Sequence, residues 1–200
     1  MPVSSSTPVV SLTELSELIQ RLSEKVRAAG FQPDVLVYIE TGARLPAWEL
    51  CRELGVGAIP VVARRRGHAL KRWMAPLARL LPRSIMDAMR RAEERSGVHA
   101  RTGRRVVFPV AYDFRNKAIL LVDDAADTGG TLVAVRQELV QRGADVARLR
   151  TAVLAATTPA GRARVDFYML DRNSVLPWSS DSCDRKEAQA LMAKVNLPSP

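Results

Sequence analysis

Residues 119–131 read ILLVDDAADTGGT, and this stretch decides the fold class. Four apolar residues lead directly into two adjacent carboxylates, Asp123 and Asp124, and a third, Asp127, precedes a turn of small residues. An amphipathic run over 132–142 follows. The pattern predicts a buried strand, a polar loop at its carboxyl end and the start of a helix. Open α/β sheets bind their ligands at that place.

The turn after the acids, TGGT at 128–131, has the chemistry of an anion site. It offers hydroxyls and backbone N–H groups, the helix dipole favours negative charge there, and glycines allow a phosphate to approach the backbone closely. The neighbouring carboxylates suit sugar hydroxyls or a Mg²⁺ ion that the ligand carries. The sequence therefore predicts a sugar phosphate, and the alternative is an ordinary strand–turn–helix with acidic surface residues. Neither G-x-G-x-x-G nor a loop ending in Gly-Lys-[Ser/Thr] occurs in the chain.

The same stretch resembles the phosphoribosyl diphosphate (PRPP) signature of type I phosphoribosyltransferases: an apolar strand, two acids, two variable residues, then Asp-Thr-Gly-x-Thr. The resemblance implies that Asp123 and Asp124 hold the ribose hydroxyls and a Mg²⁺ ion bound through PRPP. It implies that the phosphate loop binds the 5-phosphate with Asp127, Thr128, Gly129, Gly130 and Thr131. Asp127 also matches the carboxylate that takes a proton from the acceptor. The implied reaction is transfer of a pentosyl group, in which a nitrogen nucleophile displaces pyrophosphate from C1 of PRPP.

A second similarity covers 33–47, which looks like the first strand and the pyrophosphate loop of these enzymes. The matching loop residues are Thr41, Gly42, Ala43 and Arg44. The family usually has Arg-Gly-Gly or Lys-Gly-Gly, so the Cβ of Ala43 is expected to strain the loop. Arg44 either replaces the missing cation or is a surface arginine. Glu40 either repels pyrophosphate or orients Arg44.

A third similarity, over 165–178, is to the small hood of the xanthine/hypoxanthine branch. Tyr168 and Trp178 are expected to stack on a planar acceptor, whereas Phe167 is as well explained by packing. In that branch a lysine after the fourth strand contacts the purine oxygen, and its place here falls near Thr157. The resemblance thus implies a heterocyclic acceptor, purine-like or specialised, and does not name one.

The rest of the chain alternates strand and helix patterns. Helices are expected over 12–29, 46–54, 132–142 and 184–195, and strands over 35–39, 58–63, 106–110, 118–122 and 149–155. This order predicts an α/β fold of the phosphoribosyltransferase type, with a parallel sheet flanked by helices. We expect a disordered tail over 1–10 and one domain over 11–200, which includes a hood over 156–180.

Most of the positive charge lies in one segment, 64–105, which holds 13 Lys or Arg against 3 Asp or Glu. The remaining 17 basic and 18 acidic residues nearly balance. Apolar residues at near-helical spacing and Pro82 predict a helical insertion with one basic and one apolar face. It could pack on the core or on a second subunit, serve as a lid over PRPP, or bind nucleic acid, which is not favoured. We expect a homo-oligomer.

Composition bounds the cellular setting. No apolar run is long enough to span a bilayer, and the N-terminus lacks the features of a secretory signal. The two cysteines, Cys51 and Cys183, are too far apart in the sequence to form a typical metal-binding motif. We expect a cytoplasmic protein with reduced thiols. Two functions remain open: a Mg²⁺-dependent phosphoribosyltransferase of nucleotide metabolism, and a PRPP-sensing regulator that binds nucleic acid through its basic segment. The same chemistry run in reverse, pyrophosphorolysis of nucleotides, is a third.

Overall fold

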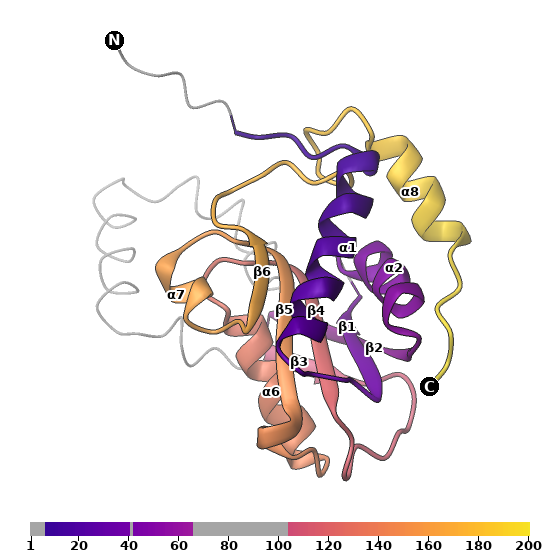
Figure 1. Cartoon of the computed structure of the whole chain (residues 1–200), viewed down its shortest axis with the longest axis vertical. Coiled ribbons are helices and arrows are strands. Elements are labelled where there is room, and N and C mark those ends of the chain that lie inside the picture. The colour runs from indigo at the N-terminus through magenta and orange to yellow at the C-terminus, as the bar shows by residue number, and fades with distance from the viewer. Residues whose placement is uncertain (1–6, 41, 66–103) are drawn as a thin grey trace, which may run out of the picture.

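Six strands form one sheet in the order β3-β2-β1-β4-β5-β6 (Figure 1). The computed structural model describes residues 7–40, 42–65 and 104–200. The strands are β1 (Val35–Ile39), β2 (Gly57–Arg65), β3 (Arg104–Val107), β4 (Ile119–Ala126), β5 (Leu149–Ala156) and β6 (Phe167–Leu170). Neighbouring strands are parallel except for β2 and β3, which pair antiparallel at one edge. The predicted α/β class with a largely parallel sheet is confirmed.

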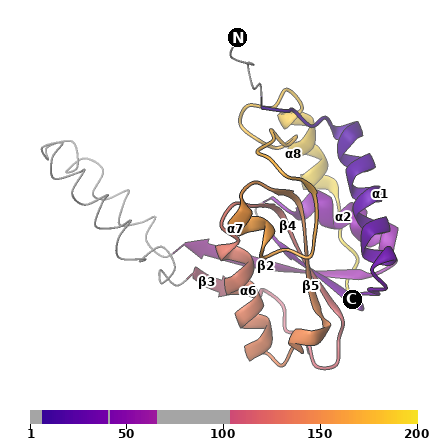
Figure 2. The same cartoon turned by 60° about the vertical axis from the view of Figure 1, so that its left-hand side comes forward.

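Helices cover both faces of this sheet (Figure 2). They are α1 (Leu12–Ala28), α2 (Arg44–Leu54), α6 (Gly130–Gln141), α7 (Pro159–Arg162), α8 (Arg185–Lys194) and the short 3-10 turn η1 (Val146–Arg148). One buried apolar cluster lies between the sheet and α1 with α2, and the second lies between the sheet and α6. We call these the α1 face and the α6 face of the sheet.

Local sequence signals place the ends of the first helix. Ser11 accepts a hydrogen bond from the Glu14 backbone N–H, and the Glu14 carboxylate accepts one from the Ser11 N–H, which together form a capping box. Five buried positions, among them Leu15 and Ile19, then line one side of α1. The amphipathic pattern therefore orients α1 against the α1 face of the sheet.

Two elements extend further than the sequence indicates. Strand β4 continues to Ala126, beyond the predicted end at Val122, because it stays paired with β5 as far as Ala126 opposite Ala156. The stretch 165–178, for which no strand was expected, contains β6, which pairs with β5. Pairing with a long neighbouring strand supplies hydrogen bonds that the local sequence pattern does not reveal.

The expectation of a disordered tail over 1–10 is wrong for its last residues. Val9 forms a bridge with Val175, Val10 donates its N–H to the Val175 carbonyl, and Val10 is buried. Pairing with the chain that follows β6 fixes this segment. The predicted insertion over 64–105 lies outside the described residues, except for its two ends in β2 and β3.

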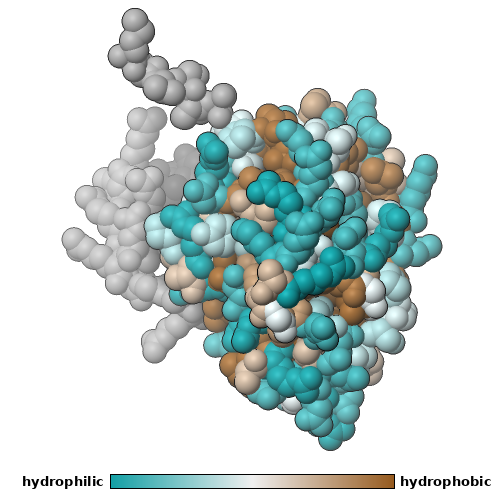
Figure 3. All heavy atoms as spheres, viewed as in Figure 1, coloured by the Kyte–Doolittle hydropathy of each residue, from teal (hydrophilic) through white to brown (hydrophobic). Residues whose placement is uncertain are grey.

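The molecular surface in Figure 3 is mostly hydrophilic, with apolar residues interspersed between charged ones. Large exposed apolar side chains in the described ranges are Val9, Val107, Val110, Val140, Val146 and Leu191. Single apolar residues of this kind are normal on a surface in contact with water. Among the residues that the structure describes, no helix combines the length and apolar character needed to cross a membrane.

Candidate active site

The carboxyl ends of β1, β4 and β5 lie side by side and carry the polar residues singled out by the sequence. β1 is the point at which the strand order reverses, because the chain passes from β1 to β2 on one side and later to β4 on the other. Ligands of open α/β sheets bind in the crevice beside such a strand. The loop after β1 and the loop after β4 therefore face one another across the candidate site.

Asp123 and Asp124 occupy consecutive positions of β4, so their side chains point to opposite faces of the sheet. Asp123 is in register with Val153, which belongs to the core on the α6 face. Asp124 contacts Trp178, which packs on the α1 face. The two side chains thus leave the strand in different directions, yet their carboxylates stay close enough for the Asp124 side chain to raise the pKa of Asp123.

Asp123 is the most deeply buried acid of the site, with 7 % of its surface exposed. Burial is the main reason why the pKa of its carboxyl is raised well above the ordinary 3.8, and the neighbouring Asp124 carboxylate adds to the effect. Arg104 acts in the opposite direction, and one Asp123 oxygen accepts the Asp124 N–H at 2.9 Å. Ionisation of Asp123 is therefore unfavourable in the ligand-free protein, and a bound cation would favour the ionised form.

We expect Asp123→Asn to stabilise the ligand-free protein. Asparagine keeps the acceptor for the Asp124 N–H and cannot ionise, so at pH 8, where the wild-type carboxyl is most ionised, the Tm should rise by about 2–4 °C, or about 1 kcal/mol for a chain of this length. Because the folded state binds this proton more tightly than the unfolded chain, wild-type stability should decrease as the pH rises from about 4 to the raised pKa. Thermal melts of wild type and variant between pH 4 and 8 measure both effects. An equal pH dependence in the two proteins would contradict this assignment.

Asp124 connects three parts of the chain. Its Oδ2 accepts a hydrogen bond from the indole Nε1 of Trp178 at 3.1 Å, and its Oδ1 accepts the Ala125 N–H at 2.8 Å. The same carboxylate lies against Gly42, where a Cβ would be only 1.7 Å from Oδ2. The hood, strand β4 and the pyrophosphate loop therefore meet at one carboxylate, and glycine at position 42 makes this approach possible.

The phosphate loop turns sharply into α6. Gly129 has φ +65°, a conformation that favours glycine, and its carbonyl accepts the Val133 N–H in the first turn of the helix. Backbone N–H groups at a helix start lack intrahelical partners and favour an anion. The predicted loop and helix start at 128–131 are therefore present, and their geometry suits a phosphate.

Asp127 is held by the loop that follows β5. Thr157 donates its hydroxyl to Asp127 Oδ1 and its N–H to the Ala126 carbonyl, and the Thr158 hydroxyl bonds to the Asp127 carbonyl. Gly161 lies so close that a Cβ there would be 2.1 Å from the Ala126 carbonyl oxygen. These contacts fix the phosphate loop from the side of β5.

Arg44 and Glu40 resolve one question left open by the sequence. Arg44 begins α2, and its guanidinium pairs with Glu40 at 2.9 Å and donates to the Val195 carbonyl at 3.3 Å. Glu40 thus orients Arg44, and both are tied to the C-terminal segment. The expected strain at Ala43 is absent, because Ala43 has φ −86°, which alanine adopts readily. Thr41 lies outside the described residues.

Tyr168 lies in β6, in register with Val153 and through it with Asp123. Two strand spacings separate the backbones of Tyr168 and Asp123 by about 10 Å. Its ring packs on the α6 face, and Lys25 lies 5.9 Å from the ring centre. The roles of Tyr168 and Trp178 towards an acceptor remain predictions, and Trp178 has in addition its bond to Asp124.

The sequence analysis missed three residues at the phosphate loop. Arg104 donates to the Thr131 hydroxyl, Arg164 donates to the Thr128 carbonyl at 2.8 Å, and Thr157 bonds to Asp127. For Thr157 a signal existed, because Thr158 followed by Pro159 is a typical helix start and places the turn before α7. Arg104 comes from β3 and Arg164 from the turn between α7 and β6, and no local pattern indicates either contact.

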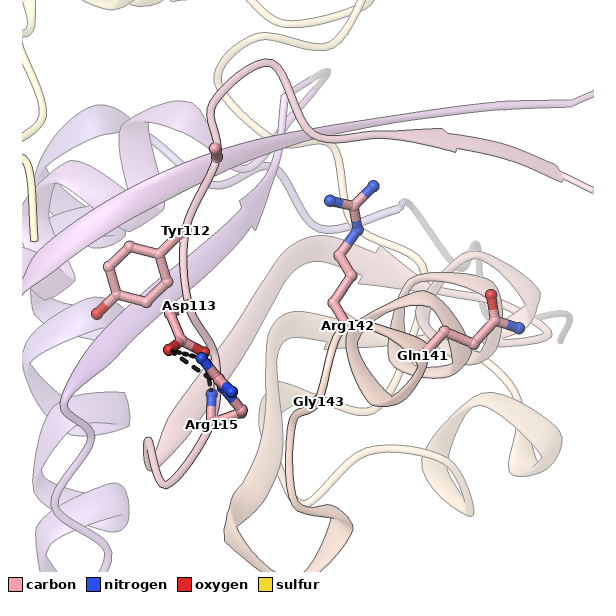
Figure 4. Close-up of a pocket in the computed structure, with 7 residues that line it drawn as sticks. Tyr112, Asp113, Arg115, Gln141, Arg142 and Gly143 are labelled. Atoms are coloured by element: carbon pink, nitrogen blue, oxygen red, sulfur yellow. Dashed lines mark hydrogen bonds and ion pairs between the residues drawn. The ribbon is translucent and has the colours of Figure 1, made fainter.

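An open hollow of about 660 Å³ lies elsewhere, between Tyr112, Asp113 and Arg115 on one side and Arg142 and Gly143 on the other (Figure 4). It is at the C-terminal end of α6, about 18 Å along that helix from the phosphate loop. Asp113 and Arg115 already pair at 2.8 Å. Because the hollow lies at the opposite end of α6 from the phosphate loop, it is not part of the candidate site.

Known proteins share this fold. The chain is similar to the purine phosphoribosyltransferase of Pyrococcus horikoshii Ot3, with 22 % identity and a TM-score of 0.62 over 86 % of this chain and 94 % of the other. It is also similar to the xanthine-guanine-hypoxanthine phosphoribosyltransferase of Helicobacter pylori, with 16 % identity and a TM-score of 0.59 over 92 % of this chain and 98 % of the other. A third similar structure is that of a hypothetical protein of Neisseria gonorrhoeae with bound ppGpp, with 19 % identity and a TM-score of 0.55 over 94 % of this chain and 97 % of the other. At such identities the similarity concerns the fold.

No curated protein sequence matches the chain. A family model, the phosphoribosyl transferase domain, matches residues 11–185. This range contains the whole sheet, both loops of the site and the hood. The chain therefore belongs to the phosphoribosyl transferase domain family, as the signature at 119–131 predicts.

Proposed function

We propose that this protein is a Mg²⁺-dependent phosphoribosyltransferase, which transfers the 5-phosphoribosyl group of PRPP to a nitrogen of a planar heterocycle and releases pyrophosphate. The observation that carries the proposal is the convergence on Asp124. This carboxylate, the proposed ribose ligand, lies against Gly42 of the pyrophosphate loop and belongs to β4, the strand that leads to the phosphate loop. A ligand with a phosphate, a pentose and a pyrophosphate in this order matches the phosphate loop, Asp124 and the pyrophosphate loop, respectively.

The side chains of the site fit a magnesium ion that PRPP brings with it. Within the described ranges, no three His, Cys, Asp or Glu side chains are grouped closely enough to hold a metal ion by themselves. Two carboxylates remain, and Mg²⁺ commonly binds through one or two carboxylates together with substrate oxygens. Asp123 and Asp124 are the residues that would hold it, and the ion would neutralise charge on the departing pyrophosphate.

The remaining residues position the substrate and move one proton. The start of α6 and the loop N–H groups bind the 5-phosphate, and the Asp124 carboxylate accepts hydrogen bonds from the ribose hydroxyls. Asp127 lies at the end of β4 beside the phosphate loop and would accept the proton from the attacking nitrogen. Thr157 holds the Asp127 carboxylate by a hydrogen bond and so fixes its direction.

The acceptor is proposed only by class. The residue nearest to the expected lysine position, Thr157, is a neutral donor that already bonds to Asp127. A purine-like or specialised heterocycle with a nucleophilic ring nitrogen is compatible with this arrangement. The hood residues Tyr168 and Trp178 are the proposed stacking surfaces.

The test is to incubate the protein with PRPP, Mg²⁺ and a panel of purines, pyrimidines and other nitrogen heterocycles, and to measure release of pyrophosphate. We expect release to require both PRPP and one class of base, and to be abolished by a chelator. Calorimetry with PRPP and Mg²⁺ gives an independent readout. Absence of both binding and turnover would refute the proposal.

A second candidate function, a PRPP-sensing regulator, is favoured by one observation. The cation of the pyrophosphate loop, Arg44, is engaged by Glu40 and the C-terminal segment. A site that binds PRPP but stabilises the leaving pyrophosphate weakly would suit a sensor. Tight PRPP binding without turnover on any base, together with PRPP-dependent and salt-dependent retention on nucleic acid, would decide for this function.

A further inference from the structure

Arg104 reaches the phosphate loop from the opposite edge of the sheet. It begins β3, the antiparallel edge strand, and alternation along that strand places Arg104 and Val106 on one side and Arg105 on the other. Val106 packs into the core on the α6 face, whereas Arg105 is exposed. The Arg104 side chain therefore points toward α6, and that of Arg105 points away from it.

The guanidinium of Arg104 lies over the first turn of α6. Its Nη1 donates to the Thr131 hydroxyl, and its Nη2 is 3.4 Å from the place where a Cβ on Gly130 would be. The Thr128 hydroxyl oxygen is 3.5 Å from that same place. Two hydroxyls, one guanidinium and the start of a helix thus surround Gly130, which leaves the backbone open to a ligand.

We propose that Arg104 is a direct ligand of the 5-phosphate and completes the phosphate loop with a positive charge. This inference rests on the proposed function and adds to it a binding residue that lies outside the signature. A phosphate that accepts hydrogen bonds from the loop N–H groups would lie next to the Arg104 guanidinium, which is held beside Thr131, and would accept hydrogen bonds from it as well. The planar guanidinium with its five donors suits a phosphate, and charge-assisted bonds of this kind are among the strongest in proteins.

Arg104 would also make the two ends of the site differ in charge. The phosphate loop lies beside three acids, Asp123, Asp124 and Asp127, whose charge opposes an anion. Arg104 is close enough to Asp123 to lower its pKa, so its charge acts on this acidic group as well. A 5-phosphate dianion is bound where Arg104 offsets the acids, whereas the pyrophosphate end lies at the other loop, beside Gly42.

The test compares Arg104→Gln with Arg105→Gln, which removes the same charge from the next residue on the opposite side of β3. Calorimetry with ribose 5-phosphate, and separately with magnesium pyrophosphate, reports on the two ends of the site. We expect Arg104→Gln to weaken ribose 5-phosphate binding about 10- to 100-fold, the loss of a charge-assisted hydrogen bond, and to leave pyrophosphate binding within about twofold. Arg105→Gln should bind both ligands like wild type.

A third variant, Arg104→Lys, keeps the charge and loses the planar fork, so an intermediate affinity for ribose 5-phosphate is expected. Equal ribose 5-phosphate affinity in wild type and Arg104→Gln would overturn the role of Arg104 while the proposed function stands. An equal loss for ribose 5-phosphate and pyrophosphate would overturn it as well, because Arg104 would then act as a general charge. If wild type binds neither ribose 5-phosphate nor PRPP, the proposed function itself fails. Thermal melts of the three variants confirm that each is folded.

Discussion

Asp127→Asn is expected to lower kcat by about 10²- to 10⁴-fold, the range for loss of a general base, and to leave PRPP affinity nearly unchanged. Asparagine retains the Oδ1 acceptor for the Thr157 hydroxyl, so the link between the phosphate loop and the β5 loop survives. The bond from the Thr158 hydroxyl to the Asp127 backbone carbonyl does not depend on the Asp127 side chain. The change removes the negative charge and with it the capacity to take a proton.

Pyrophosphate release with the acceptor found in the panel measures kcat, and calorimetry with PRPP and Mg²⁺ measures affinity. Asp171→Asn is the matched control, because Asp171 is an exposed acid outside the site and the change should leave both values as in wild type. A tenfold or greater loss of PRPP affinity in Asp127→Asn, with kcat preserved, would show that Asp127 binds the sugar phosphate and does not act as the base.

The strand, loop and helix start that carry the candidate site could be predicted from the sequence because their signals are local. The apolar run of β4, the acids that end it and the glycine turn are contiguous, and strand, loop and helix start each leave their own pattern. The capping box of α1 and the left-handed Gly55 that ends α2 are local in the same sense. Where backbone conformation and nearest neighbours decide the structure, the sequence is sufficient.

What the sequence could not show depends on contacts between distant segments. Arg104 meets Thr131, and Trp178 meets Asp124, across 27 and 54 residues. The same holds for Val9, which pairs with Val175. Alternation along β4 was also hidden, because the strand was expected to end before the acids. Once pairing with β5 carries the strand through Asp123 and Asp124, their opposite orientations follow.

The second prediction concerns Gly42→Ala, because Gly42 lies so close to the Asp124 carboxylate that no side chain fits between them. A Cβ at this position would be 1.7 Å from Oδ2 and 2.3 Å from Cγ of Asp124, so the carboxylate has to move. It would then lose its bonds to the Trp178 indole and the Ala125 N–H.

We expect Gly42→Ala to weaken PRPP binding about 10- to 100-fold, as displacement of a charged hydrogen-bonding group does, and to lower the Tm because the Asp124 bonds to Trp178 and Ala125 are lost. The control is a double-mutant cycle with Asp124→Ala, which opens the space that the new methyl group needs. If Gly42 acts through Asp124, adding Gly42→Ala to Asp124→Ala should change PRPP affinity by less than about threefold. Additive losses in calorimetry would mean that Gly42 contacts the pyrophosphate directly. Non-additivity would place the junction of the two loops at the Asp124 carboxylate, where the pentose has to lie if the proposed reaction is correct.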